Sequence, residues 1–154
     1  MSKRSIKQVA VLGSGIMGSR IACHFANIGL KVLLLDIAPD KLTDEEAKAG
    51  KSLEDTAVRN RIVNTSFQNT LKANPAPLYR KSFAGRIRTG NFTDHLKDIA
   101  TCDWVLEAVI ENIDIKRSLF EQVERYRKPG TLITSNTSGI PIHLMAQGRS
   151  EDFR

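Results

Sequence analysis

Short apolar runs alternate with longer amphipathic stretches along this chain. Segments with the length of strands, most of them rich in apolar residues, occupy residues 8–12, 31–36, 86–92, 103–109 and 131–135. Between them, apolar residues recur at intervals of three and four, which is the spacing of helices with one buried face. Helices are accordingly predicted over residues 16–28, 53–73, 93–100, 113–126 and 140–146. Alternating strands and helices are typical of a doubly wound, parallel α/β sheet, and this is the predicted fold.

In two of the predicted helices, the spacing predicts which residues form the buried apolar face. The helix at 16–28 carries Ile16, Met17, Ile21, Phe25 and Ile28. The helix at 53–73 carries Leu53, Ala57, Val58, Ile62, Phe67 and Leu71. Thr93 is predicted to cap the helix that follows, and Pro141 is predicted to lie in the first turn of the last one.

Three glycines follow the first apolar run, in the segment GSGIMG. Gly13 allows a tight turn, Gly15 lets a pyrophosphate approach backbone N–H groups, and Gly18 lets the next helix pack closely on the strand. The N-terminus of that helix adds partial positive charge beneath the phosphates. The alternative is that the glycines make a tight turn and nothing more.

Asp36 ends the second apolar run, about 20 residues after the glycines, where a carboxylate can accept hydrogen bonds from an adenosine ribose. It would repel a 2′-phosphate, and neither Ile37 nor Ala38 supplies the cation that could offset this. The pattern therefore favours NAD over NADP, the alternative being an acid in an ordinary loop. The residues predicted to bind the dinucleotide at this end are Gly13, Ser14, Gly15, Ile16, Met17, Gly18 and Asp36.

Two polar segments follow later strands, on the side where ligands bind in an open parallel sheet. They are EAVIENIDIK at 107–116 and TSNTSGIP at 134–141. Glu111 and its neighbours could contact a ligand or serve as caps and dipole partners of the next helix. Ser138 could likewise contact a ligand or cap the last helix. The pattern alone leaves both pairs of interpretations open.

Composition narrows the class of protein. The chain of 154 residues is one domain in length, and no apolar run is long enough to span a membrane. The N-terminal region does not read as a signal peptide, so a cytoplasmic location is predicted. Cys23 and Cys102 lie far apart without metal-ligand spacing, which predicts buried thiols and no metal site.

The net charge is +6, and basic residues gather in the middle of the chain. They are Arg59, Arg61, Lys72, Arg80, Lys81, Arg86 and Arg88. They could form a solvated surface or bind an anion. Because no nucleic-acid-binding motif accompanies them, a small polyanion is the favoured partner and nucleic acid is not.

Four segments, in order and spacing, resemble the L-3-hydroxyacyl-CoA dehydrogenase family of fatty-acid β-oxidation, in its bacterial form. They are GSGIMGSRIA, LLLD, EAVIENIDIKRSLF and KPGTLITSNTSGIPI. The resemblance implies a Rossmann-like domain and the NAD-dependent oxidation of L-3-hydroxyacyl-CoA to 3-oxoacyl-CoA. It also implies a helical insertion, around residues 41–80, that helps to hold CoA. Candidates for contact with the CoA phosphates are Lys51, Arg59, Arg61 and Lys72.

The resemblance also assigns roles to residues in this sequence. The glycine turn would hold the pyrophosphate, and Asp36 the adenosine ribose. Glu111 and Lys116 would contact the nicotinamide half of NAD. Ser138 would touch both cofactor and substrate near the reacting hydroxyl, which makes it the predicted catalytic residue. Gly139 stands where many relatives carry a second serine.

The family's catalytic base is a histidine, paired with a glutamate, in an aromatic-rich strand beyond the serine segment. His24, His95 and His143 do not match that position. We therefore expect residues 1–154 to be an NAD-binding domain whose sheet is truncated before its last strand or strands. The helical C-terminal domain that makes the family's homodimer would also be absent, and the chain alone would bind NAD with negligible turnover.

Two other functions remain open from the sequence. One is an NAD-dependent dehydrogenase of a free 3-hydroxyacid, which would share the glycine turn but should lack the paired ENxxxK and SNTS segments. The other is a non-catalytic NAD-binding module.

Overall fold

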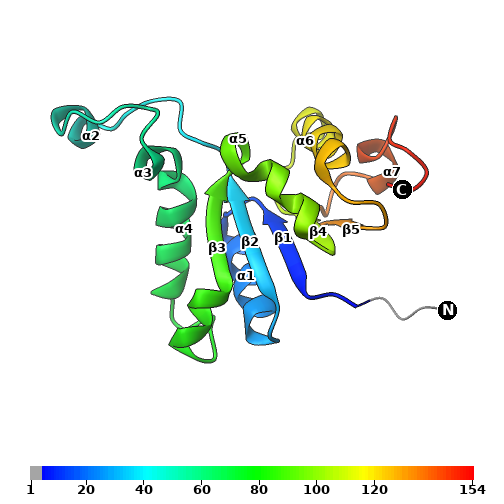
Figure 1. Ribbon diagram of the computed structural model, residues 1–154, viewed down its shortest axis with the longest axis horizontal. Helices are drawn as coiled ribbons and strands as arrows, with labels where there is room; N and C mark the ends of the chain where they lie inside the picture. Colours follow the sequence, from blue (N-terminus) through cyan, green and yellow to red (C-terminus); the bar gives the residue numbers. More distant parts are fainter. Residues whose placement is uncertain (1–4) are drawn as a thin grey trace.

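The computed structural model describes residues 5–154 and contains one five-stranded, fully parallel sheet. Its strands are β1 (Gln8–Leu12), β2 (Lys31–Asp36), β3 (Ile87–Asn91), β4 (Trp104–Glu107) and β5 (Leu132–Ser135). They lie in the order β3-β2-β1-β4-β5, so the chain starts in the centre, builds outward on one side, and then crosses to the other (Figure 1). This order places a ligand-binding crevice beyond the carboxyl ends of β1 and β4, where the direction of winding reverses. The predicted doubly wound, Rossmann-like fold is confirmed.

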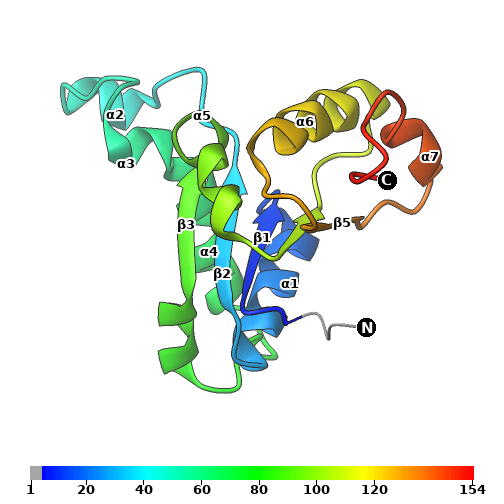
Figure 2. The same ribbon diagram turned by 45° about the vertical axis from the view of Figure 1, so that its right-hand side comes forward.

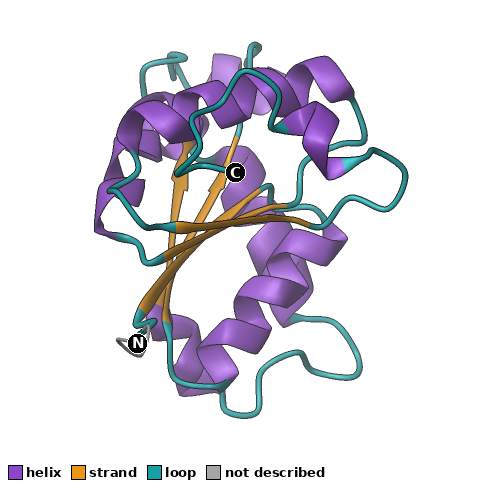
Figure 3. Ribbon diagram, turned by 90° about the vertical axis from the view of Figure 1, so that its right-hand side faces the viewer, coloured by secondary structure: helices purple, strands orange, loops and turns teal. Residues whose placement is uncertain are grey.

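Helices cover both faces of the sheet (Figure 3). One face carries α1 (Ile16–Asn27) and α4 (Arg61–Leu71), and the other carries the 3₁₀ helix η2 (Leu96–Thr101), α6 (Ile113–Tyr126) and α7 (Ile142–Met145). The remaining helices are α2 (Asp44–Lys48), α3 (Thr56–Arg59), the 3₁₀ helix η1 (Lys81–Arg86) and α5 (Phe92–His95). No helix within residues 5–154 is both long and apolar enough to cross a membrane.

Alternate residues of the central strand, β1, lie in two separate hydrophobic cores, one on each face of the sheet. Val9 and Val11 pack with α1 and α4, whereas Ala10 and Leu12 pack with η2 and α6. All four are fully buried. A strand covered on both faces needs apolar residues at every position, which is why the sequence here shows a continuous apolar run rather than an alternating one.

The buried face of α1 differs from the predicted one. Ile16 and Met17 are largely exposed, while Ala22, Cys23 and Ala26 are fully buried against the sheet. Phe25 is buried as predicted, and the small side chains beside it let the helix axis lie close to the strands. The two bulky residues at its first turn instead border the glycine turn.

The single helix predicted at 53–73 is divided into α3 and α4 at Asn60. Leu53 is 41% exposed, and the residues of the two helices that are buried are Val58, Val63 and Phe67. The prediction of Val58 and Phe67 as buried is confirmed, whereas Leu53 and the continuous helix were wrong because one helical period was carried across the break. Together with α2, α3 forms an arm that extends from the body of the sheet (Figure 2).

The cap predicted for the next helix was also wrong. Asn91, at the end of β3, accepts a hydrogen bond from the backbone N–H of Asp94, and α5 therefore begins at Phe92. After one turn the chain tightens into η2. Thr93 lies inside the helix because Asn91 is the better-placed oxygen acceptor for the free N–H groups of the first turn.

Both cysteines are free and buried, as predicted. Burial raises the pKa of the Cys102 thiol to about 11 and also raises that of Cys23. Since the thiolate is the reactive form, neither residue has the properties of a nucleophile at neutral pH.

Candidate functional site

The glycine turn joins β1 to α1 at the carboxyl edge of the sheet. Gly13 has a φ of 109°, and a side chain there would come within 2.5 Å of the Ala108 carbonyl oxygen. A side chain at Gly18 would overlap with the carbonyl oxygen of Gly13. The first and third glycines thus have the structural roles that the motif predicts, a tight turn and close helix packing.

Gly15 is different, because among residues 5–154 nothing lies within 4 Å of the position that its Cβ would occupy. It is the N-cap of α1, no side chain caps that end, and the first turn contains no acidic residue. The N–H groups of the first turn have no partners within the helix. An uncapped helix end with an open glycine above it fits the diphosphate of a dinucleotide.

Asp36 is fixed against the same turn. Its Oδ2 accepts hydrogen bonds from Ser14 N and Ser14 Oγ, at 2.7 and 2.5 Å, and its Oδ1 accepts one from Ile37 N at 2.7 Å. Asp36 therefore has a defined place as a support of the turn, and its predicted contact with an adenosine ribose stays a prediction. Ser14 is fully buried and supports Asp36, while its predicted contact with the cofactor stays a prediction.

A cavity of about 530 Å³ opens beside Asp36, between the end of β2 and α6. Its walls are mainly apolar, and they include Ile37, Val109, Ile110 and Ile115. The volume and the apolar lining are those of a small-molecule site. The carboxylate at its edge supplies the polar group that such a cavity needs to orient a ligand.

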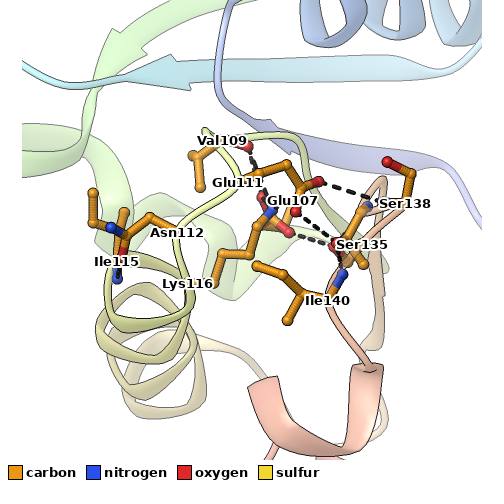
Figure 4. Close-up of polar contacts among 10 residues, drawn as sticks. Glu107, Val109, Glu111, Asn112, Ile115, Lys116, Ser135, Ser138 and Ile140 are labelled. Carbon is orange, nitrogen blue, oxygen red and sulfur yellow. Dashed lines mark hydrogen bonds and ion pairs between the residues drawn. The ribbon is translucent and has the colours of Figure 1, made fainter.

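The predicted residues of the second site converge from two strands (Figure 4). Glu111, in the loop after β4, accepts a hydrogen bond from Thr137 Oγ1 at 2.8 Å and a longer one from Ser138 N at 3.4 Å. Its Oε1 lies 3.9 Å from Lys116 Nζ. Lys116 comes from α6 and Ser138 from the loop after β5, so the structure brings Ser138 to two residues that precede it by more than 20 positions.

A buried ion pair at the centre of this site was not predicted. Glu107 and Lys116 are 0% and 1% exposed, and Glu107 Oε1 lies 2.7 Å from Lys116 Nζ. The same oxygen accepts a hydrogen bond from Val109 N at 2.7 Å, and the other carboxylate oxygen accepts one from Ser135 Oγ. Two signals in the sequence could have revealed the pair. Glu107 interrupts an apolar strand, and Lys116 lies on the apolar face of its helix, so each needs a partner of opposite charge.

The capping interpretations are resolved differently for the two segments. Asn112 caps α6, because its side chain accepts hydrogen bonds from Asp114 N and Ile115 N. Ser138 does not cap the last helix, which begins at Ile142 after Pro141 as its N-cap. Ser138 is exposed, and its backbone N–H faces Glu111.

The basic residues in the middle of the chain are partly used within it. Arg59 forms ion pairs with Glu54 and with Asp94, the latter at 2.9 Å, and Arg61 pairs with Glu46. These contacts count against the hypothesis that the two arginines bind CoA phosphates. Lys51 and Lys72 are exposed and remain candidates.

The family model for the NAD-binding domain of 3-hydroxyacyl-CoA dehydrogenases matches residues 8–154. The chain belongs to this family. The match covers both sites described above, and it confirms the resemblance seen in the sequence and NAD as the cofactor.

Curated relatives agree with this family. A protein of Bacillus subtilis (strain 168) named "Probable 3-hydroxyacyl-CoA dehydrogenase" is 45% identical over 98% of this chain and 19% of its own length. A protein of the same name from Deinococcus radiodurans is 44% identical over 97% of this chain and 39% of its own length. The chain therefore spans about a fifth to two fifths of these relatives.

Solved structures of the family share the fold. The 3-hydroxybutyryl-CoA dehydrogenase of Escherichia coli K12 has a TM-score of 0.63 and 28% identity, over 96% of this chain and 28% of that one. The (S)-3-hydroxybutyryl-CoA dehydrogenase of Ralstonia eutropha has a TM-score of 0.61 and 29% identity, over 92% of this chain and 44% of that one.

Proposed function

We propose that this chain is the coenzyme-binding part of an enzyme that oxidises L-3-hydroxyacyl-CoA to 3-oxoacyl-CoA in fatty-acid β-oxidation. The observation that carries the proposal is that Glu111 contacts both Lys116 and the backbone N–H of Ser138, in a segment whose first residues, Ala108 and Val109, lie against Gly13. NAD, when bound, accepts the hydride. The protein binds and orients the coenzyme and the substrate hydroxyl.

The adenosine half of NAD is proposed to occupy the cavity beside Asp36. The uncapped start of α1 would hold the diphosphate through the backbone N–H groups of the segment Gly15–Gly18, with Ile16 and Met17 bordering it. Asp36 would accept hydrogen bonds from the adenosine ribose. Support comes from the fixed position of its carboxylate at the edge of the cavity.

The nicotinamide half is proposed to contact Glu111, Lys116 and Ser138. The hydroxyl of Ser138 would donate a hydrogen bond to the substrate oxygen and so orient the carbon that loses hydride. This role would make Ser138 a catalytic residue. Its exposure and its position next to Glu111 support this role. The proton acceptor would be the family's His–Glu pair, and no segment of residues 1–154 matches that pair.

The remaining partners are proposed from the family. The acyl-CoA would be held in part by the helical arm between β2 and β3, where Lys51 and Lys72 are exposed. A cytoplasmic location and a homodimer formed through a separate helical domain stay predictions.

A direct test compares substrates in the complete gene product. We expect NAD-dependent oxidation of 3-hydroxybutyryl-CoA and little or no oxidation of free 3-hydroxybutyrate, followed by the absorbance of NADH. Residues 1–154 alone should bind NAD in calorimetry with negligible turnover. Faster oxidation of the free acid would reject the acyl-CoA proposal, and NAD binding without any dehydrogenase activity would favour a non-catalytic module.

Replacing Asp36 should change the choice of coenzyme. In the double variant Asp36→Ala, Ile37→Arg, the repulsion of a 2′-phosphate is gone and a guanidinium can bind it. We expect the ratio of the Kd for NADP to the Kd for NAD to fall by roughly tenfold or more, a change of about 1.4 kcal/mol. Calorimetry with both coenzymes measures it.

The variant Asp40→Asn is the matched control, because it removes an exposed carboxylate from the same loop. It should leave the ratio of the two Kd values unchanged. If the double variant also kept the ratio of the unmodified chain, Asp36 would not contact the ribose.

A further inference from the structure

Polar contacts around the second site form a closed ring (Figure 4). Lys116 Nζ pairs with Glu107 Oε1, and the other oxygen of Glu107 binds Ser135 Oγ. Ser135 Oγ in turn accepts a hydrogen bond from Thr137 N at 3.1 Å. Thr137 Oγ1 donates to Glu111, whose Oε1 lies 3.9 Å from Lys116 Nζ and closes the ring.

Glu107 is the buried member from which this ring branches. One carboxylate oxygen holds the ammonium group of α6, and the other holds a hydroxyl at the end of β5. The first oxygen also accepts the N–H of Val109, whose neighbour Ala108 lies directly under Gly13. The side chain of Glu107 therefore connects three parts of the site. It binds Lys116 of α6, it reaches the serine loop (residues 136–140) through Ser135, and it holds Val109 N next to the residue that lies under the glycine turn.

The burial of the pair adds a second reason to assign Glu107 a role. Two charges removed from water carry a desolvation penalty that their attraction only repays in good geometry, so burial of an ion pair is weak evidence for a contribution to stability. Here Lys116 of the pair lies next to Glu111, and Glu107 binds Ser135 at the start of the serine loop that carries Ser138. Glu111, Lys116 and Ser138 are the residues predicted to contact the cofactor. The geometry thus favours a positioning function over a stabilising one.

We propose that Glu107 is a positioning residue that holds Lys116 and the serine loop in register for the nicotinamide half of NAD. The proposal rests on the proposed function, which places Glu111, Lys116 and Ser138 at that half. Glu107 itself does not touch the coenzyme. It acts by fixing Lys116 Nζ from one oxygen and the start of the serine loop, through Ser135, from the other.

Comparison of NAD with ADP-ribose isolates the contacts to the nicotinamide ring, since ADP-ribose carries the adenosine, the diphosphate and the second ribose but no nicotinamide. In the variants Glu107→Gln and Ser135→Ala we expect the preference for NAD over ADP-ribose, measured as a ratio of Kd values by calorimetry, to fall severalfold. The Kd for ADP-ribose should stay within about twofold, because Asp36 is untouched and the amide in Glu107→Gln can still accept the hydrogen bond from Val109 N that supports the glycine turn. A general loss of structure would instead weaken both ligands together.

The matched control is Glu124→Gln. Glu124 is another carboxylate of α6, and it binds Arg149 and Ser150 N near the end of the chain rather than the site. It should leave both Kd values unchanged. Ser135→Ala is the milder variant, because it keeps the ion pair and removes only the link to the loop, so it decides the question if Glu107→Gln does not fold.

The possible outcomes distinguish failure of the positioning role of Glu107 from failure of the proposed NAD-binding site. If the unmodified chain binds NAD no better than ADP-ribose, the assignment of the nicotinamide half fails. If the unmodified chain prefers NAD and Ser135→Ala and a folded Glu107→Gln keep that preference in full, the positioning role alone is rejected.

Discussion

Replacing Lys116 with methionine should lower the free energy of unfolding by about 3–5 kcal/mol, because it leaves the carboxylate of Glu107 buried without its counter-charge. Glu107 is 0% exposed, so water cannot replace the lost ammonium group without local opening. Methionine has nearly the length of the lysine stem, and the cavity that it leaves is small. Urea unfolding followed by circular dichroism, with the unmodified chain alongside, measures the change.

The double variant Glu107→Gln, Lys116→Met is the control for this effect. The amide can still accept the hydrogen bond from Val109 N and can reach Ser135, while no charge remains buried. We expect it to recover most of the stability lost in Lys116→Met. A loss of less than about 1 kcal/mol in the single variant would show that the pair is solvated in solution, contrary to the structure.

The predicted strands and the main helices came from features that are local in sequence. Continuous apolar runs gave β1 and β2, because a parallel sheet buries both faces of its central strands. The glycine turn and Asp36 could be found because their spacing along the chain is fixed by one βαβ unit. Helix α6 was predicted with its observed bounds, since its apolar period is unbroken.

The errors in helix boundaries arose where a contact between residues distant in sequence decides the boundary, or where two side-chain oxygens could cap the same helix. The break at Asn60 and the cap at Asn91 belong together, because the side-chain amide of Asn91 donates to that of Asn60 at 2.7 Å. The spacing of apolar residues along a helix cannot predict a hydrogen bond between residues 31 positions apart. The face of α1 was predicted correctly at Phe25 but not at Ile16 and Met17, because bulky residues were given more weight than the small ones that close approach to the sheet requires.

Glu107 and Ser135 were missed for a related reason. Each lies at the end of a strand, and the two strands pair in parallel, so that Glu107 lies opposite Ser135 in the register. A sequence shows which residues end strands but does not show which strands are neighbours. Once the order β1-β4-β5 is known, the meeting of the two side chains follows from the register alone.

The second large effect concerns the glycines, which look equivalent in the sequence and should behave in opposite ways. Gly18→Ala places a methyl group against the Gly13 carbonyl oxygen, and both partners are backbone atoms that cannot rotate away. Helix α1 must then move off β1, and we expect a loss of stability at or above the upper end of the range of about 1–3 kcal/mol that is usual for overpacking. Thermal and urea unfolding measure it.

Gly15→Ala should leave stability unchanged to within about 0.5 kcal/mol, because Gly15 has a φ of −56° and open space where its Cβ would lie. The same methyl group would occupy the space through which a diphosphate reaches the N–H groups of α1. We therefore expect the Kd values for NAD and for ADP-ribose to rise together, by roughly tenfold or more. This joint rise differs from the effect expected at Glu107, where NAD alone weakens. If Gly15→Ala binds both ligands normally, the diphosphate does not lie over the start of α1, and the coenzyme must be oriented differently from the arrangement proposed here.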